Sequence, residues 1–533
     1  MHHVLGIYVN NTMLEVDKML EKCGDFSRQQ LILLLLCPLI NLLSAMHFRS
    51  YSILNTVPKY WCADGLDSGA PPPSESNCKP LYNNSTHSSS CKKYNYEHYM
   101  GYQSFVSEMN WICDQEDKLS KGDSVYFAGC LIGCLVMGYL ADRLGRVPIL
   151  VLAKVITIFG NFLTIFGMSL ALYCIFRFIT GFVINSNFFI VRILIVEYMR
   201  PSLRTVCLNI CFGFFLFLGM VSTPWIAILL GTWRRFMLLE MVSIIMVPIF
   251  FYFVPESVQW LISRKKYGQA IAALRRVAKI NGRQIDDNVF KEFIDDCKLS
   301  QQNAKNNPNL LDLFRTPHLR RTYLILLFEF MVLPYYCKLI VYYVRGFKIS
   351  PFVMSSLRTA PILPACLVVI ILQDRIGRKA LALTIRLLIV LFLLLSGVFL
   401  SHAANRLLFT FFVIGSFLCN LAFQSNMQYA MELIPTCVRG QALGAIHDVD
   451  LMYIICVKYI LNTSADFLSL PEIILGVLTL LGACLFLLLP ETMNRTLPCS
   501  LEDGEKLGND EHWYTFGCME KRTQPEALDG LAQ

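Results

Sequence analysis

Three short motifs occur twice along the chain, in the same order and at almost the same separation. Segment 138–146, GYLADRLGR, has a counterpart in segment 373–379, QDRIGRK. A glutamate seven positions before an arginine occurs as Glu197/Arg204 and again as Glu432/Arg439, and a Pro-Glu-Ser/Thr motif occurs at 255–257 and 490–492. The three separations are 232, 235 and 235 residues. This regular spacing predicts two homologous halves.

Both halves consist mainly of apolar segments long enough to cross a lipid bilayer. Apolar residues make up 55% of the 533 positions and charged residues only 16%, which is unusual for a soluble chain of this length. About 20 apolar residues span the hydrocarbon core as a helix, which satisfies its own backbone groups in lipid. We predict an all-α membrane protein with twelve transmembrane helices in two pseudo-symmetric six-helix lobes. The spans centre on residues 31–54, 125–140, 148–168, 170–190, 206–230, 236–254, 322–343, 350–372, 380–400, 407–423, 442–461 and 473–489.

The polar segments complete the domain organisation. Basic residues concentrate in segment 258–321 and in the short loops after Asp142 and Asp374, and such an excess marks the cytoplasmic side. The net charge of +8 therefore reflects membrane topology and gives no reason to expect a nucleic-acid partner. The first apolar segment is too long for a cleavable signal peptide. The predicted units are a cytoplasmic N-terminus 1–30, an N-terminal lobe 31–257 with an extracellular loop 55–121, a cytoplasmic helical segment 258–321, a C-terminal lobe 322–490 and a cytoplasmic tail 491–533.

The large loop between the first two spans has the composition of an extracellular segment. It contains four cysteines and two overlapping sugar-acceptor signals, at Asn83 and Asn84. Disulfides and glycosylation both belong to an oxidising, extracellular face. We predict two disulfides, for which three pairings are possible; free thiols are the alternative. The cysteines are Cys62, Cys78, Cys91 and Cys113.

The repeated charged residues fall where predicted helices leave the membrane. A carboxylate at such a place caps the N-terminus of a neighbouring helix or pairs with an arginine. Ion pairs that form and break suit a packed interface with two discrete arrangements, so we predict that they close two lobes on the cytoplasmic side. The alternative is that they only anchor loops and set topology. The residues assigned to gating are Asp142, Arg143, Arg146, Glu197, Arg204, Asp374, Arg375, Arg378, Glu432 and Arg439.

These motifs resemble those of a known family. Segment 138–146 is similar to the signature loop of the major facilitator superfamily. Segment 255–264, PESVQWLISR, resembles the motif after the sixth helix in the solute carrier 22 family, the organic cation, anion and zwitterion transporters; so do ELIPTCVR at 432–439, LPET at 489–492 and WICD at 111–114. The resemblance extends from about residue 26 to residue 505. It implies a plasma-membrane transporter with a central site for small organic ions.

Ionisable residues inside the spans are costly and therefore are candidates for the substrate site. The resemblance places the pair Tyr335-Tyr336 in the cavity of the seventh helix, just before Lys338. It also aligns Asp450, with Asp448 as a competitor, to a position that is Asp in cation carriers and Arg in anion carriers. Lys458, eight residues on, either neutralises Asp450 or holds the other end of a zwitterion. The predicted substrate-binding residues are Tyr335, Tyr336, Lys338, Phe423, Gln424, Asp450 and Lys458.

Other intramembrane charges are left outside this set. Arg192 lies deep enough to reach a cavity, but the register of its helix is open. Glu240 and Arg386 lie one or two turns from helix ends, from which their charged groups can snorkel to the interface. His447 is expected to be a satisfied helix-end histidine rather than part of a metal site or proton relay.

The chain lacks the residue sets of an enzyme. No phosphate-binding Gly-rich loop with lysine is present, so ATP-driven transport is unsupported, and we predict no catalytic residues, metal or cofactor. The predicted function is secondary-active or facilitative transport of small organic ions by alternating access, with a cation or zwitterion favoured over an anion. The alternatives are an organic anion exchanger of the same family and a non-transporting sensor or partner subunit of the same fold. The predicted partners are the substrate and the bilayer, with the oligomeric state left open.

Overall fold

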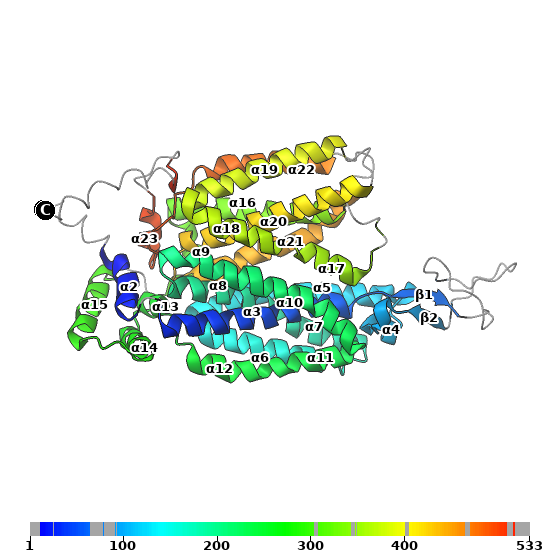
Figure 1. Cartoon of the computed structure of the whole chain (residues 1–533), viewed down its shortest axis with the longest axis horizontal. Coiled ribbons are helices and arrows are strands. Elements are labelled where there is room, and N and C mark those ends of the chain that lie inside the picture. Colours follow the sequence, from blue (N-terminus) through cyan, green and yellow to red (C-terminus); the bar gives the residue numbers. More distant parts are fainter. Residues whose placement is uncertain are drawn as a thin grey trace.

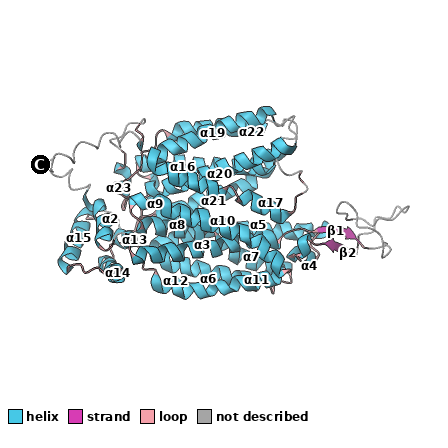
Figure 2. Ribbon diagram, in the orientation of Figure 1, coloured by secondary structure: helices cyan, strands magenta, loops and turns pink. Residues whose placement is uncertain are grey.

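The chain forms a bundle of helices that run along one long axis (Figure 1). The computed structural model describes residues 11–24, 26–63, 78, 91, 93–302, 307–342, 347, 349–399, 405–463, 470–508 and 515–517. In this part of the chain, nearly all regular structure is helical (Figure 2). The exception is the antiparallel pair β1 (Lys59–Cys62) and β2 (Tyr94–Glu97), which lies at one end of the bundle.

The first lobe contains six membrane-spanning segments, three of which are built from more than one helix. The fifth span passes through a π-helical turn, η3, and the sixth through the short 3-10 segment η4. The helices are α3 (Arg28–Leu54), α5 (Glu116–Leu144), α6 (Arg146–Thr164), α7 (Leu170–Ile184) with α8 (Ser186–Tyr198), α9 (Pro201–Asn209) with η3 (Ile210–Phe215) and α10 (Leu216–Leu230), and α11 (Trp233–Met241) with η4 (Val242–Ile245) and α12 (Met246–Phe253).

The second lobe repeats this arrangement. Its helices are α16 (Pro317–Tyr342), α17 (Pro351–Thr359) with α18 (Ile362–Ile376), α19 (Arg378–Phe399), α20 (Asn405–Leu433), α21 (Arg439–Thr463) and α22 (Leu470–Phe486). Within the described residues, ten helical segments are long and apolar enough to cross a membrane. The spans formed by α21 and α22 complete the predicted twelve, and the predicted fold class is confirmed.

The two ends of the bundle differ in composition. One, which we call the charged end, carries the repeated motifs together with α2 (Asn11–Lys22), α13 (Val258–Ser263), α14 (Tyr267–Ile280), α15 (Asp287–Ser300), η5 (Leu310–Phe314) and α23 (Leu501–Lys506) (Figure 1). An apolar cluster that includes Met19, Leu274 and Phe293 packs α2 against α13–α15. The opposite end, which carries β1 and β2, is called the disulfide end.

The disulfide end is stabilised by two bridges and an aromatic cluster. Disulfides join Cys62 to Cys91 and Cys78 to Cys113, one of the three pairings that the sequence left open. Phe105 of α4 (Phe105–Met109) stacks on Tyr173 of α7, so the loop is packed directly on the first lobe. The sugar-acceptor positions Asn83 and Asn84 lie outside the described residues. A further disulfide joins Cys337 of α16 to Cys419 of α20.

This pairing predicts which thiol each cysteine substitution frees. In Cys62→Ser, Cys91 should become reactive to maleimide while Cys78 and Cys113 stay bridged. Loss of a bridge typically lowers the free energy of unfolding by about 2–4 kcal/mol. Here it should destabilise mainly the loop, since both bridges lie outside the two lobes. Peptide mapping under non-reducing conditions measures the connectivity. Labelling of Cys78 or Cys113 in Cys62→Ser would contradict it, and the wild type, in which all four loop cysteines are bridged, is the control.

Each lobe encloses a charged cluster of its own. Glu240 of α11 pairs with His47 of α3 at 3.3 Å, and its Oε2 accepts from Asn161 at 2.9 Å. In the second lobe, Arg386 of α19 pairs with Glu329 of α16 at 2.7 Å. The expectation that Glu240 and Arg386 snorkel to the interface is wrong, because both side chains are buried beside partners from other helices of their own lobe.

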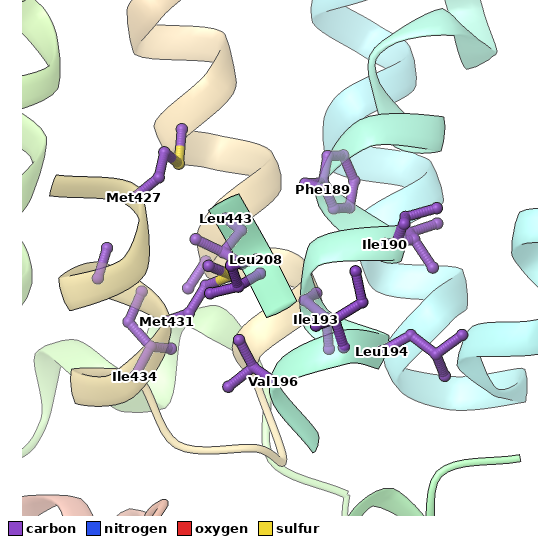
Figure 3. Close-up of a cluster of buried hydrophobic side chains, with 14 of the residues drawn as sticks. Phe189, Ile190, Ile193, Leu194, Val196, Leu208, Met427, Met431, Ile434 and Leu443 are labelled. Atoms are coloured by element: carbon purple, nitrogen blue, oxygen red, sulfur yellow. The ribbon is translucent and has the colours of Figure 1, made fainter. Parts of the chain in front are cut away.

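Between the lobes, towards the charged end, lies an apolar contact. Phe189, Ile193 and Val196 of α8 and Leu208 of α9 belong to the same buried cluster as residues of α20 and α21. Figure 3 shows this contact, with α8 on one side and Met427, Met431, Ile434 and Leu443 on the other. Burial of apolar side chains from both lobes stabilises the arrangement in which the charged end is closed.

Candidate functional site

The charged end is closed by a carboxylate that reaches from one lobe to the other. Asp142, near the C-terminus of α5, accepts hydrogen bonds from the backbone N–H groups of Gly440 and Gln441 at 3.0 and 2.9 Å. The Gln441 side-chain amide donates to it at 3.2 Å. Because Gly440 and Gln441 begin α21, Asp142 caps a helix of the opposite lobe, where the helix dipole favours negative charge.

The second copy of the motif makes the corresponding contact on the other side of the interface. Asp374, near the C-terminus of α18, accepts a hydrogen bond from the Thr205 hydroxyl of α9 at 2.8 Å. It also pairs with Arg378 at 2.9 Å, as Asp142 pairs with Arg146 at 3.0 Å. Helix α9 begins the fifth span and α21 the eleventh, so the two motifs are related by the pseudo-symmetry of the lobes.

The third repeated motif, Pro-Glu-Ser/Thr, holds the charged loop of each lobe through backbone hydrogen bonds. Glu256 accepts from the backbone N–H groups of Arg146 and Val147, at 3.0 and 3.2 Å. Glu491 accepts from those of Arg378 and Lys379 at the same distances. Each glutamate thus caps the helix that follows the charged loop. Burial raises the pKa of the Glu256 carboxyl, and the hydrogen bonds from backbone amides and the charge of Arg146 oppose that rise.

A buried glutamate joins arginines from both lobes. Glu197, at the end of α8, lies 3.3 Å from Arg146 of its own lobe and 2.9 Å from Arg439 of the other. All three side chains are buried. Arg146 also donates to the Thr436 carbonyl across the interface at 2.8 Å. Such charges are stable in the interior only while each stays paired.

The arrangement is not symmetric in its charges. Glu432, the counterpart of Glu197, pairs with Arg378 of its own lobe at 3.2 Å. Arg204, the counterpart of Arg439, instead pairs with Asp17 of α2 at 3.3 Å. Burial raises the pKa of the Asp17 carboxyl, and the charge of Arg204 opposes this rise.

The two remaining gating candidates lie at the margin of this network. Arg143 donates to Asn309, in the segment before η5, at 2.9 Å. Arg375 is exposed. The structure therefore brings eight of the ten predicted gating residues into the buried or half-buried network and leaves these two outside it.

Close helix contact accompanies the interlobe hydrogen bonds. Gly138 of α5 and Gly440 of α21 approach so closely that a Cβ on either would overlap the backbone of the other, and a Cβ on Gly444 would overlap the carbonyl oxygen of Cys134. Small residues are required here because the backbones of α5 and α21 are in direct contact.

The predicted substrate residues are divided between the interface and the second lobe. Gln424 of α20 donates to the Phe212 carbonyl of η3 at 3.3 Å and so crosses the interface, next to Phe423. Tyr336 lies in the core of the second lobe, where its hydroxyl donates to the Gly415 carbonyl at 3.2 Å. Tyr335 packs against that same core. The tyrosine pair therefore does not join Phe423 and Gln424 at the interface.

Helix α21 carries two acidic residues, of which Asp448 lies beside Cys134 of α5 in the other lobe. Asp448 is 9% exposed, and within the described residues its buried carboxylate oxygens have no hydrogen-bond partner other than the Cys134 thiol. Asp450 is half-buried. Among the side chains that the structure describes, neither forms an ion pair with a lysine or arginine. The side chains of Lys338 and Lys458 lie outside the described residues, so the pairing of Lys458 with Asp450 remains a prediction.

Two further interface residues were left out of the predicted site. Arg192 of α8 is only 5% exposed and lies against Phe212 and Phe423. His447 of α21 has a buried, unbonded Nε2, so it is not the satisfied helix-end histidine that was expected. The signal in the sequence was the arginine within an otherwise apolar run, FFIVRILIV at 188–196.

The fold and the family model that matches the chain are those of membrane transporters of the major facilitator class. Residues 82–499 match the model of the sugar (and other) transporter family. The chain belongs to that family. The helices superimpose on the proton:xylose symporter XylE bound to 6-bromo-6-deoxy-D-glucose with a TM-score of 0.61 and 18% identity, over 89% of this chain and 98% of that one. This similarity concerns the fold alone.

Similar sequences confirm the resemblance to the solute carrier 22 family. Organic anion transporter 3 of Sus scrofa is 28% identical over 80% of this chain and 77% of its own. The organic cation transporter-like protein of Drosophila melanogaster is 25% identical over 92% and 93%. Solute carrier family 22 member 3 of Mus musculus is 28% identical over 86% and 82%. Relatives named for anions and relatives named for cations thus both match most of this chain.

Proposed function

We propose that this protein carries small organic ions across the plasma membrane by alternating access, as a secondary-active or facilitative transporter. The observation that supports this most strongly is the duplicated closure of the charged end, in which Asp142 meets α21 and Asp374 meets α9 across the interface. Duplicated contacts between two lobes suit a site at the repeat interface that opens to either side in turn. The relatives that are named as organic anion and cation transporters supply the substrate class.

The orientation follows from charge. The charged end, with the basic segment 258–321, is proposed to face the cytoplasm, together with both termini. The disulfide end is then extracellular, where disulfides form and persist. The closed network of Asp142, Glu197 and Arg439 corresponds to a state in which the site is shut from the cytoplasm.

The acidic residues of α21 support a cation or a zwitterion as the substrate. Asp448 lies at the interface beside Cys134 and Asp450 is half-buried on the same helix, and neither has a cationic partner among the described side chains. A carboxylate in such a place is costly unless a cation compensates it. A transported ammonium group would supply that charge. The anion exchanger and the non-transporting protein of the same fold are the outcomes that would replace this proposal.

Uptake by cells that express the protein at their surface tests the function. A panel of labelled organic cations, anions and zwitterions should show saturable uptake of at least one class. Uptake of anions only, accelerated by an anion on the opposite side, would identify an exchanger of anions. No uptake of any class by surface-expressed protein would favour the sensor or partner subunit.

Asp450→Asn should selectively reduce cation uptake. The substitution removes the negative charge but keeps the size, so a fall in kcat/KM of about tenfold or more is expected for a contact worth 1.5–3 kcal/mol. Uptake of an uncharged or anionic member of the panel should change little. Asp287→Asn is a matched control, since Asp287 forms an exposed pair with Arg275. Unchanged cation uptake in Asp450→Asn would remove the reason for favouring cations.

A further inference from the structure

Arg192 is a buried arginine whose charge is not matched by the protein. Seven arginines of the described chain are buried. Arg146, Arg204, Arg378, Arg386 and Arg439 each pair with a carboxylate, and Arg177 donates to Asn161 and Thr164. Within the described residues, Arg192 forms neither an ion pair nor a hydrogen bond, and its Nε is buried and unbonded. A cation in that position is costly unless a ligand compensates it.

Aromatic rings of both lobes contact the Arg192 guanidinium. Its Cζ lies 4.0 Å from the ring centroid of Phe212, in η3 of the first lobe, and 5.3 Å from that of Phe423, in α20 of the second. Ring faces attract the cation, but they leave the N–H groups at the edge of the guanidinium without acceptors. The unsatisfied donors therefore lie at the interface between the lobes.

His447 provides a second unsatisfied nitrogen nearby. Its ring stacks on Phe189 of α8 at a centroid distance of 5.6 Å, and its Nε2 is buried without a partner. Phe189 lies three residues before Arg192 on α8, so the two side chains share a face of that helix and the His447 ring packs on the same face. Asp448, the next residue on α21, lies instead beside Cys134 of α5.

From these contacts we infer that Arg192 and His447 form a subsite for a carboxylate of the transported molecule. This inference rests on the proposed function and adds a chemical group to its substrate. The edge of a guanidinium binds a carboxylate through two parallel hydrogen bonds, and the imidazole N–H donates a third. Phe212 and Phe423 contact an aromatic or apolar body attached to that carboxylate.

The position of the subsite connects it with the acidic residues of α21. Asp450 lies three residues beyond His447, about 4.5 Å further along the helix axis towards the disulfide end. Residues three apart share a face of a helix, so Asp450 is on the side of α21 that carries His447, and a zwitterion would place its carboxylate at the arginine and its ammonium group at the aspartate. Arg192 and Phe212 belong to one lobe and His447 and Phe423 to the other, so a bound carboxylate bridges both lobes.

Three labelled probes of similar size separate the charges. Benzoate has only the carboxylate, benzyltrimethylammonium only the cation, and phenylalanine both. In proteoliposomes, Arg192→Gln should lower kcat/KM for benzoate and phenylalanine by roughly 10- to 100-fold, the range for hydrogen bonds to a charged group. Benzyltrimethylammonium transport should be unchanged or faster, because a repelling charge is removed. Arg192→Lys should retain part of the benzoate transport. Arg177→Gln, a buried arginine of the same lobe, should affect all three probes equally.

A binding measurement separates this inference from the transport function. Benzoate should raise the melting temperature of the purified wild-type protein and of Arg177→Gln, but not that of Arg192→Gln. A benzoate shift that persists in Arg192→Gln, or no shift in the wild type, overturns the subsite. Equal loss of transport for all three probes in Arg192→Gln also overturns it. A benzoate shift that depends on Arg192, without transport of any probe, supports the subsite and contradicts the proposed function.

Discussion

Glu197→Gln should abolish transport by opening the charged end. The wild-type carboxylate compensates two buried arginines, Arg146 and Arg439, one from each lobe. Glutamine leaves Arg439 without its carboxylate partner, while Arg146 keeps Asp142. Breaking a buried pair costs about 3–5 kcal/mol, which shifts the equilibrium between the two states by roughly 100- to 1,000-fold or more. The fall should be in kcat rather than in substrate affinity. Distances between spectroscopic labels at the exposed positions Leu144 and Glu502, introduced with non-canonical amino acids, measure the opening directly.

The counterpart in the second lobe is the matched control. Glu432 pairs with Arg378 of its own lobe and makes no ion pair across the interface within the described residues. Glu432→Gln should therefore affect the stability of the second lobe more than the separation of the lobes. Equal label distances in the two variants would show that the interlobe pair does not hold the charged end closed.

Gly444→Ala should also favour the state that is open at the charged end. A Cβ at this position overlaps the carbonyl oxygen of Cys134 in α5, and that contact exists only while the lobes are together. Overpacking costs about 1–3 kcal/mol, equivalent to a shift of roughly 5- to 150-fold towards the open state. Transport should fall while surface expression stays normal, and the label distance between Leu144 and Glu502 should increase.

Alanine substitutions at two other glycines separate an effect on lobe closure from an effect on folding. A Cβ at Gly133 overlaps the Phe182 carbonyl within the first lobe, a contact that rocking of the lobes does not relieve, so Gly133→Ala should lower expression. Gly476 of α22 has open space around it, so Gly476→Ala should behave as the wild type. Loss of expression in Gly444→Ala comparable to that in Gly133→Ala would mean that the α5–α21 contact is needed for folding rather than for closure.

The features that were predictable from the sequence are those encoded locally or by repetition. Apolar length identifies the spans, because backbone hydrogen bonding in lipid leaves few alternatives to a helix. Repetition locates Asp142 and Asp374 at equivalent helix ends, and each indeed meets a helix of the opposite lobe. The capping role of the carboxylate was also accessible, since it depends on the position of the residue at a helix end.

The features that were not predictable depend on partners from distant segments. Glu240 and Arg386 are near helix ends, but whether each reaches outwards or inwards depends on His47 and Glu329, which belong to other helices. Arg192 required the register of α8 against η3 and α20, which the apolar pattern around it does not fix. The cysteine pairing depended on the fold of the loop, since spacing alone allows three pairings.

The unequal distribution of charge at the closed end has a consequence for the direction in which the lobes move apart. Where α21 meets the first lobe, the contacts include the Asp142 cap and the buried ion pair between Glu197 of α8 and Arg439. Between α9 and α18, the contact is a hydrogen bond from the Thr205 hydroxyl to Asp374, while Arg204 pairs with Asp17 and donates to the Arg495 carbonyl. Within the described residues, opening the contact between α9 and α18 separates no buried ion pair between the lobes. Separation of the lobes should therefore begin between α9 and α18, and the contact between α5 and α21 should be the last to open.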